Sequence, residues 1–188
     1  MHVFLRILRV LVPVALLAVA VAAVVSVLSA RPDLSNARSR VDGAWSQLAP
    51  RLDTRYQLLA AASTKLASVQ GPVHSVAGEV NTALAHWRHD RQSHTPVAEQ
   101  VQAANDLEAT GRQLVATASA SPRVKSDAPA QAALYAFLSD KALSAAGGSN
   151  GFNPSVAAYE HERRGPVRAV VARMLGDGNI PALDTAGV

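Results

Sequence analysis

The sequence predicts an all-α protein in which one N-terminal transmembrane helix precedes an antiparallel bundle of about four long helices. Three observations predict this fold class. Residues 10–30 form an apolar run without a charged residue, which is long enough for a helix to cross a bilayer. From residue 34 onward, apolar positions recur at spacings of three and four, the period of an amphipathic helix. Aromatic residues make up only 4% of the chain, and most apolar residues are Ala, Val and Leu, a composition typical of closely packed helices.

The apolar run at residues 10–30 is predicted to be a retained membrane anchor. A short basic tail, residues 1–9, precedes it, so a cleaved signal peptide is the alternative interpretation. The run is longer than the apolar core of a cleavable signal, and it lacks an A-x-A cleavage site because Leu28 lies two residues before Ala30. An anchor is therefore favoured over a signal peptide. The predicted membrane-anchor residues are Val10, Leu16, Leu17, Val24 and Leu28.

The orientation of this anchor depends on a nearly balanced distribution of charge. Arg6 and Arg9 precede the span, whereas Arg31, Arg38 and Arg40 follow it. A short basic tail before a long span is typical of a signal anchor whose tail stays inside. We therefore expect a single-pass protein of the cell membrane with an extracytoplasmic domain.

The first bundle helix is predicted to extend from Leu34 to Val69, with its apolar residues on one face. Pro50 is expected to kink this helix, because Ala49 would be a poor N-cap for a new one. Gly71-Pro72 ends it. A second helix is predicted from Val73 to about His89.

The remaining helices are delimited by capping residues and by proline. A third helix is predicted to start at Thr95-Pro96, with Thr95 as N-cap, and to reach Ala118. A fourth starts after the N-cap Asp127 and ends at the Gly-rich run 147–151. The last runs from Asn153 to Gly176, and Pro166 kinks or splits it. The predicted bundle domain is thus 31–176, followed by a flexible tail at 177–188, with antiparallel neighbours joined by short loops.

Charge and cysteine content exclude several kinds of function. Arg6 and Arg9 belong to the tail, which leaves 16 of the 18 Lys and Arg residues against 14 acidic residues in the domain. This surplus is too small for a nucleic-acid-binding surface. The chain has no cysteine, which excludes disulfides, thiolate metal sites and a cysteine nucleophile.

Few residues suggest a binding site. His86 and His89 lie three apart on a helical face and Asp90 follows them, so the three could begin a metal site. A hydrated helix end is the favoured interpretation, and no metal or other cofactor is predicted. Trp45 neighbours the apolar stripe and is predicted to lie in the core or an interface, whereas Trp87 is the better candidate for an exposed partner contact.

Catalytic motifs are missing from the sequence. It contains no G-x-S-x-G, no phosphate-binding loop after a strand and no recognisable pair of carboxylates. The Gly-rich run 147–151 follows a predicted helix, so it is a connection and not a nucleotide cradle. We therefore expect a protein that is not an enzyme.

Several segments, in order and at similar spacing, resemble motifs of the LemA family of bacterial membrane proteins. The resemblance is carried by Arg40–Leu48 (RVDGAWSQL), Arg55–Leu58 (RYQL), Asn105–Leu107 (NDL), Pro122–Asp127 (PRVKSD), Phe152–Tyr159 (FNPSVAAY) and Pro166. The chain departs from the family at Leu59-Ala60, at the Gly-rich run around Gly147 and at Tyr159-Glu160. The resemblance implies an N-terminal hydrophobic helix and a helical bundle of undefined molecular role.

Two functional hypotheses follow. The first is a non-catalytic interaction or scaffolding module of the bacterial cell envelope, attached to the lipid bilayer through residues 10–30. Its partner would be another membrane or envelope protein or a second copy of the chain. The alternative is a bundle that senses a small molecule in a pocket between its helices and signals through the anchor. The small Ala-rich faces favour the first hypothesis, because tight packing leaves little cavity.

Overall fold

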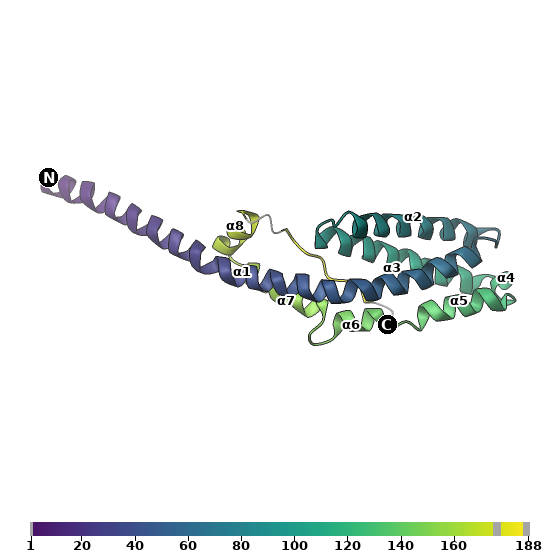
Figure 1. The fold of residues 1–188 in the computed structure, drawn as a ribbon. Helices are drawn as coiled ribbons and strands as arrows, with labels where there is room; N and C mark the ends of the chain where they lie inside the picture. The colour runs from purple at the N-terminus through teal and green to yellow at the C-terminus, as the bar shows by residue number, and fades with distance from the viewer. Residues whose placement is uncertain (1, 175–177, 186–188) are drawn as a thin grey trace. The chain divides into compact units, whose positions relative to one another are not determined.

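The protein is described from a computed structural model (Figure 1). This structure describes the backbone of residues 2–174 and 178–185 and the side chains of residues 31–165, 168–173 and 178–185. All the regular secondary structure of these residues is helical, as predicted. The helices are α1 His2–Leu66, α2 Pro72–Gln92, α3 Val97–Ala120, α4 Pro122–Lys125, α5 Ala128–Leu138, α6 Ala142–Gly147, α7 Phe152–Arg163 and α8 Pro166–Met174.

The chain divides into two compact units, which are described separately. Unit 1 consists of Met1–Ser39 and Ala158–Gly178, and unit 2 consists of Arg40–Ala157 and Asn179–Val188. This division differs from the predicted single domain at 31–176. Each unit combines stretches that are far apart in the sequence, because the chain leaves unit 2 within α7 and returns to it after Gly178.

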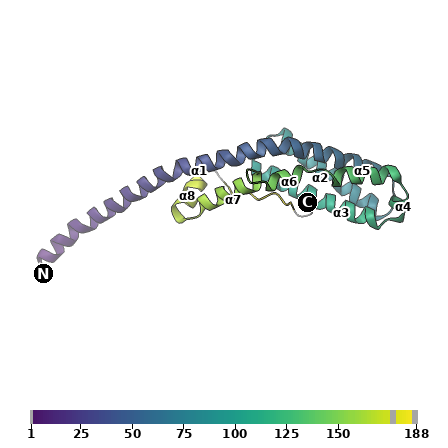
Figure 2. The same ribbon diagram turned by 90° about the horizontal axis from the view of Figure 1, so that it is seen from below.

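In unit 2, α2 and α3 form a helical hairpin connected by residues 93–96 and lie side by side (Figures 1 and 2). Both helices bury the apolar faces that the sequence predicts. The buried residues of these faces include Val73, Val76, Val80, Leu84 and Trp87 on α2 and Val101, Ala104, Leu107, Gly111, Leu114 and Ala118 on α3. Gly71 precedes α2 with a φ of 94°, a backbone conformation that favours glycine.

The part of α1 in unit 2 also buries its predicted stripe. Its buried side chains include Val41, Leu48, Leu52, Tyr56, Leu59 and Leu66. The helix continues through Pro50 without a break, and the kink expected there stays a prediction. It ends at Leu66, three residues before the predicted Val69, because residues 67–71 form turns.

The prediction of one long fourth helix is wrong, because two short helices, α5 and α6, take its place. Asp127 is the N-cap of α5, as predicted, and its Oδ1 accepts a hydrogen bond of 3.1 Å from the Ala130 amide. The chain then breaks between Leu138 and Ala142, where Asp140 Oδ1 accepts a hydrogen bond of 2.9 Å from the Ala142 amide. Lys141 is exposed in this break.

Unit 1 contains the C-terminal part of α7 and all of α8. The helix break at Pro166 matches the split that the sequence allows, and Gly165 makes the connection with a φ of 122°. Arg168 forms ion pairs with Glu162 and Asp33. Tyr159 is fully buried, and its hydroxyl donates a hydrogen bond of 3.4 Å to the Gly178 carbonyl.

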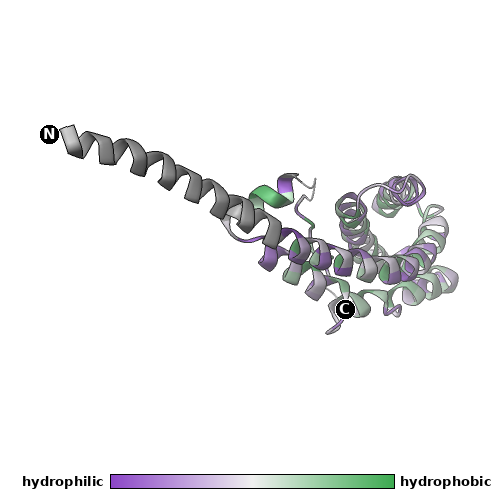
Figure 3. Ribbon diagram, turned by 60° about the vertical axis from the view of Figure 1, so that its left-hand side comes forward, coloured by the Kyte–Doolittle hydropathy of each residue, from purple (hydrophilic) through white to green (hydrophobic). Residues whose placement is uncertain are grey.

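Figure 3 shows hydrophobic and hydrophilic residues alternating along the helices of unit 2, as amphipathic helices require. Among the residues whose side chains are described, no helix is both long and apolar enough to cross a membrane. The predicted span at 10–30, with Val10, Leu16, Leu17, Val24 and Leu28, lies outside these residues.

Candidate functional site

The histidine cluster that the sequence singled out lies at the C-terminal end of α2. His86 Nε2 lies 3.7 Å from Asp90 Oδ2, and both His86 and His89 are exposed at the surface of α2. Across the side chains that the structure describes, no three His, Cys, Asp or Glu residues are grouped so that they could hold a metal ion. Asp90 is buried, and its carbonyl accepts hydrogen bonds from Thr95, so it stabilises the turn between α2 and α3.

The two predicted partner-contact residues, Trp45 and Trp87, lie in the core of unit 2. Only 3% of Trp45 and 2% of Trp87 is exposed, so neither indole ring presents a surface to a partner. The rings pack edge to face with centroids 6.2 Å apart. Phe152 and Tyr56 extend this aromatic cluster, at 5.0 Å from Trp45 and 5.1 Å from Trp87.

Polar partners satisfy the ring nitrogens of both tryptophans. Trp45 Nε1 donates to Gln100 Oε1 over 2.9 Å, and Trp87 Nε1 donates to Asp53 Oδ1 over 2.9 Å. Arg91 connects the two acceptors, because its guanidinium donates to both Gln100 and Asp53 over 3.2 Å. Trp87 is buried despite its charged neighbours in sequence because Asp53, from a different helix, supplies the acceptor that its indole requires.

A buried ion pair joins Arg55 to Glu108 in unit 2. Arg55 Nε donates to Glu108 Oε1 over 2.7 Å, and Nη2 donates to Oε2 over 3.0 Å. This two-point geometry matches the planar guanidinium to the carboxylate. Arg55 is 6% exposed and Glu108 is fully buried, so the pair connects α1 to α3 inside the protein.

The same guanidinium also binds the C-terminal end of α5. Arg55 Nη1 donates to the Phe137 carbonyl over 3.0 Å and to the Asp140 carbonyl over 3.4 Å. It lies 3.7 Å from Asp140 Oδ1. The last carbonyls of a helix lack partners within the helix and carry partial negative charge, so a cation stabilises them. Arg55 therefore stabilises the backbone at the C-terminal end of α5, where the helix ends.

The network shifts the pKa of two groups. Burial alone would lower the pKa of Arg55, but the hydrogen bonds and negative charge of Glu108, with the charge of Asp140, raise it above its usual value. Arg55 thus stays protonated. Burial raises the pKa of Tyr56 well above its usual value, and the charge of Glu108 raises it further. The Tyr56 hydroxyl donates to the Ala104 carbonyl over 3.3 Å.

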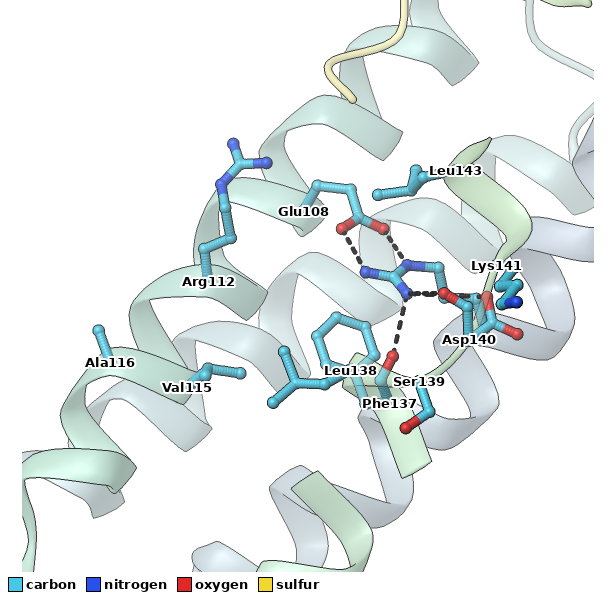
Figure 4. Close-up of a pocket in the computed structure, with 11 residues that line it drawn as sticks. Glu108, Arg112, Val115, Ala116, Phe137, Leu138, Ser139, Asp140, Lys141 and Leu143 are labelled. Carbon is cyan, nitrogen blue, oxygen red and sulfur yellow. Dashed lines mark hydrogen bonds and ion pairs between the residues drawn. The ribbon is translucent and has the colours of Figure 1, made fainter. Parts of the chain in front are cut away.

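A pocket of about 550 Å³ opens beside this network between α3, α5 and α6. Figure 4 shows its lining. The pocket is mixed in character, because the Arg55–Glu108 pair and three further charged side chains line it together with apolar side chains. Its lining residues are Arg55, Glu108, Arg112, Val115, Ala116, Phe137, Leu138, Ser139, Asp140, Lys141 and Leu143.

Two exposed apolar side chains of α5 lie at or near this pocket. Leu138 lines the pocket and is 56% exposed, and Tyr135, one turn earlier on α5, is 73% exposed. We refer to Tyr135 and Leu138 as the α5 ledge. Inside the pocket, the charges of Arg55 and Glu108 neutralise each other. The arrangement therefore suits the binding of an apolar or amphipathic group better than acid–base chemistry.

Arg55 and Glu108 were not predicted as site residues, although the sequence holds a signal for both. Arg55 lies three residues after Leu52 and four before Leu59, which is a core position of the stripe. Glu108 lies four residues after Ala104 and three residues before Gly111, which is likewise a core position of its helix. Opposite charges at core positions of two amphipathic helices indicate a buried pair.

No known family model, curated protein or solved structure matches the sequence. The LemA resemblance therefore stays a prediction.

Proposed function

We propose that the protein is a membrane-anchored interaction module of the bacterial cell envelope, in which unit 2 binds a partner protein through the α5 ledge and the pocket beside it. The anchor in this proposal is the uncharged run at residues 10–30, and the LemA resemblance agrees with such an arrangement. The partner is another envelope protein or a second copy of the chain.

The observation that carries the proposal is the exposure of Tyr135 and Leu138 next to a pocket lined in part by apolar side chains. Single exposed apolar residues are common, but here two lie one turn apart on α5, and one of them, Leu138, lines the pocket. Tyrosine is enriched in protein interfaces because its ring is large and apolar while its hydroxyl tolerates water. A partner helix with an apolar face would cover both residues.

The alternative, a bundle that senses a small molecule, is favoured by the pocket itself. Its volume of about 550 Å³ falls within the usual range of ligand-binding pockets, roughly 300–1,000 Å³. Arg112 and Lys141 at its edge could orient an anionic group of such a ligand.

Site-specific photo-crosslinking in membranes separates these functions. A benzophenone amino acid replaces Tyr135 on the ledge or, as a matched control, the exposed Ala85 on α2. We expect a discrete protein adduct from position 135 and none from position 85. Leu138→Asp, combined with the label at 135, should abolish the adduct without changing the helix content measured by circular dichroism.

Equal adducts from both positions, or an adduct unaffected by Leu138→Asp, would contradict binding at the ledge. A small molecule that co-purifies with the wild-type chain and is lost from Leu138→Asp, without any protein adduct, would favour the sensor.

A further inference from the structure

Residues 179–185, the segment NIPALDT, cross unit 2 in an irregular, non-helical conformation, and we refer to them as the strap. The strap was predicted to belong to a flexible tail. Instead, Ile180 and Leu183 are each only 2% exposed. The described backbone of the strap forms no secondary structure with the helices that it covers, so other groups must satisfy its amides and carbonyls.

Two asparagine side chains satisfy the backbone of the strap around Leu183. Asn153, in the first turn of α7, accepts from the Leu183 amide and donates to the Leu183 carbonyl, both over 2.9 Å. Asn105, on α3, accepts from the Asp184 amide over 2.7 Å and donates to the Ala182 carbonyl over 3.0 Å. All four polar atoms of the two peptide groups that flank Leu183 are therefore bonded.

This pairing reproduces with side chains what neighbouring strands do in a sheet. A carboxamide carries one acceptor and one donor group, as a peptide group does. Each asparagine therefore pairs with one edge of the extended backbone. Contacts of this kind recognise the main chain of a peptide, while pockets for alternate side chains supply the sequence preference.

Three side-chain features of the strap add sequence preference. Leu183 and Ile180, three residues apart, are buried. Asp184 Oδ2 lies 2.6 Å from Arg112 Nη2, and Arg112 is two turns after Asn105 on the same face of α3. Pro181 favours an extended backbone at the preceding residue, Ile180. Proline has no amide hydrogen, and the two asparagines bind the amides of Leu183 and Asp184 instead.

We propose that Asn105, Asn153 and Arg112 form a peptide-recognition groove that the strap occupies in cis and that an extended segment of a partner protein occupies in its place. The ligand class is an extended peptide with the pattern apolar-Pro-x-Leu-acidic. This proposal does not depend on the α5 ledge, because neither asparagine lines the pocket there. Arg112 is shared by both surfaces.

The test uses the full chain with a weakened strap. Leu183→Ala with Asp184→Ala removes the buried side chain and the ion pair but keeps both asparagines. The probe is a fluorescein-labelled NIPALDT peptide, and its binding is measured by anisotropy. The strap-weakened chain should bind the peptide at least tenfold more tightly than wild type, in which the strap competes at high effective concentration.

Two matched controls define specificity. Adding Asn153→Ala or Asn105→Ala to the strap-weakened chain should lower the affinity about tenfold each, since each removes two hydrogen bonds. A peptide with alanine at the leucine position should bind at least tenfold more weakly than NIPALDT. A thermal melt of each variant verifies that it is folded.

A folded strap-weakened chain that does not bind the peptide would overturn the proposal and leave the strap a structural element. Binding that ignores both asparagine substitutions would also overturn it. A concentration-dependent wild-type dimer that the peptide dissociates would overturn the partner assignment, because the strap of a second copy would then be the occupant.

Discussion

Glu108 is fully buried and neutralises the charge of Arg55 inside unit 2. Without its carboxylate, Arg55 would keep a buried positive charge that the carbonyls of Phe137 and Asp140 neutralise only in part. Glu108→Ala is therefore expected to lower the free energy of unfolding by about 3–5 kcal/mol, the usual cost of breaking a buried ion pair. Urea unfolding followed by tryptophan fluorescence measures this change.

The matched control for Glu108→Ala replaces the whole pair, with Arg55→Met and Glu108→Leu together. Apolar residues of similar volume leave no charge behind, so this double variant should be much more stable than Glu108→Ala alone. The structure indicates that the pair is shielded from water. A decrease of less than about 1 kcal/mol in the free energy of unfolding of Glu108→Ala would contradict this.

Tyr56 gives unit 2 an alkaline limit. Its pKa is raised above the usual value of 10.0, so the folded state holds the phenol proton more tightly than the unfolded state does. This stabilisation is complete below pH 10 and is lost as the pH rises through the folded-state pKa. Stability measured by urea unfolding between pH 8 and 11 should therefore fall above pH 10.

Tyr56→Phe should flatten that alkaline decrease while it costs about 1 kcal/mol at pH 8 through the lost hydrogen bond to the Ala104 carbonyl. Tyr135→Phe, at the exposed ledge, is the matched control and should change neither value. An alkaline decrease of the same size in Tyr56→Phe would refute the assignment.

Gly111 permits the close approach of α3 to its neighbours. A Cβ atom built there would lie 3.2 Å from the Phe137 ring and 3.3 Å from a Leu59 methyl group. The larger Gly111→Val should overpack this contact and lower the free energy of unfolding by about 1–3 kcal/mol. Differential scanning calorimetry measures the change.

The matched control is Gly78→Ala on α2, where nothing lies within 4 Å of the added Cβ. It should stabilise the protein by about 0.5–1 kcal/mol, because alanine loses less backbone entropy than glycine in a helix. A stabilising Gly111→Val would mean that the three helices are packed more loosely than described.

The helices α2 and α3 could be predicted from the sequence because apolar residues recur at helical spacing along their whole length. A proline or the end of this apolar pattern marks where each helix begins or ends. The break between α5 and α6 could not be predicted in this way. Leu134, Phe137 and Leu138 continue the helical pattern locally, whereas the break is stabilised by Arg55, more than 80 residues away in the sequence. The apolar pattern within one segment gives no information about a partner so far away in the sequence.

At the scale of the whole molecule, the sequence predicted the fold class but not the division into units or the course of the strap. Ile180 and Leu183 are too few for a periodic signal, and their partners Asn105 and Asn153 lie on helices far away in sequence. The candidate pocket was missed for a similar reason, since residues from four separate helices, α1, α3, α5 and α6, line it. Trp87 was misplaced because Asp53, which satisfies its indole, belongs to another helix.

The proposed membrane anchor can be tested on the whole chain. The protein has no cysteine, so single substitutions give clean labelling sites. With the tail inside and the domain outside, a membrane-impermeant maleimide should label Ser93→Cys in intact cells but should label His2→Cys only after permeabilisation. The reverse pattern would invert the orientation, and recovery of the full chain in the soluble fraction would refute the anchor.

The aromatic cluster gives the protein a built-in optical reporter. Trp45 and Trp87 are the only two tryptophans, and their rings lie 6.2 Å apart. At this separation their excited states couple, so the near-ultraviolet circular dichroism of the native protein depends on the mutual orientation of two indoles from α1 and α2. A slight sliding of one helix along the other therefore changes the spectrum before either helix unfolds.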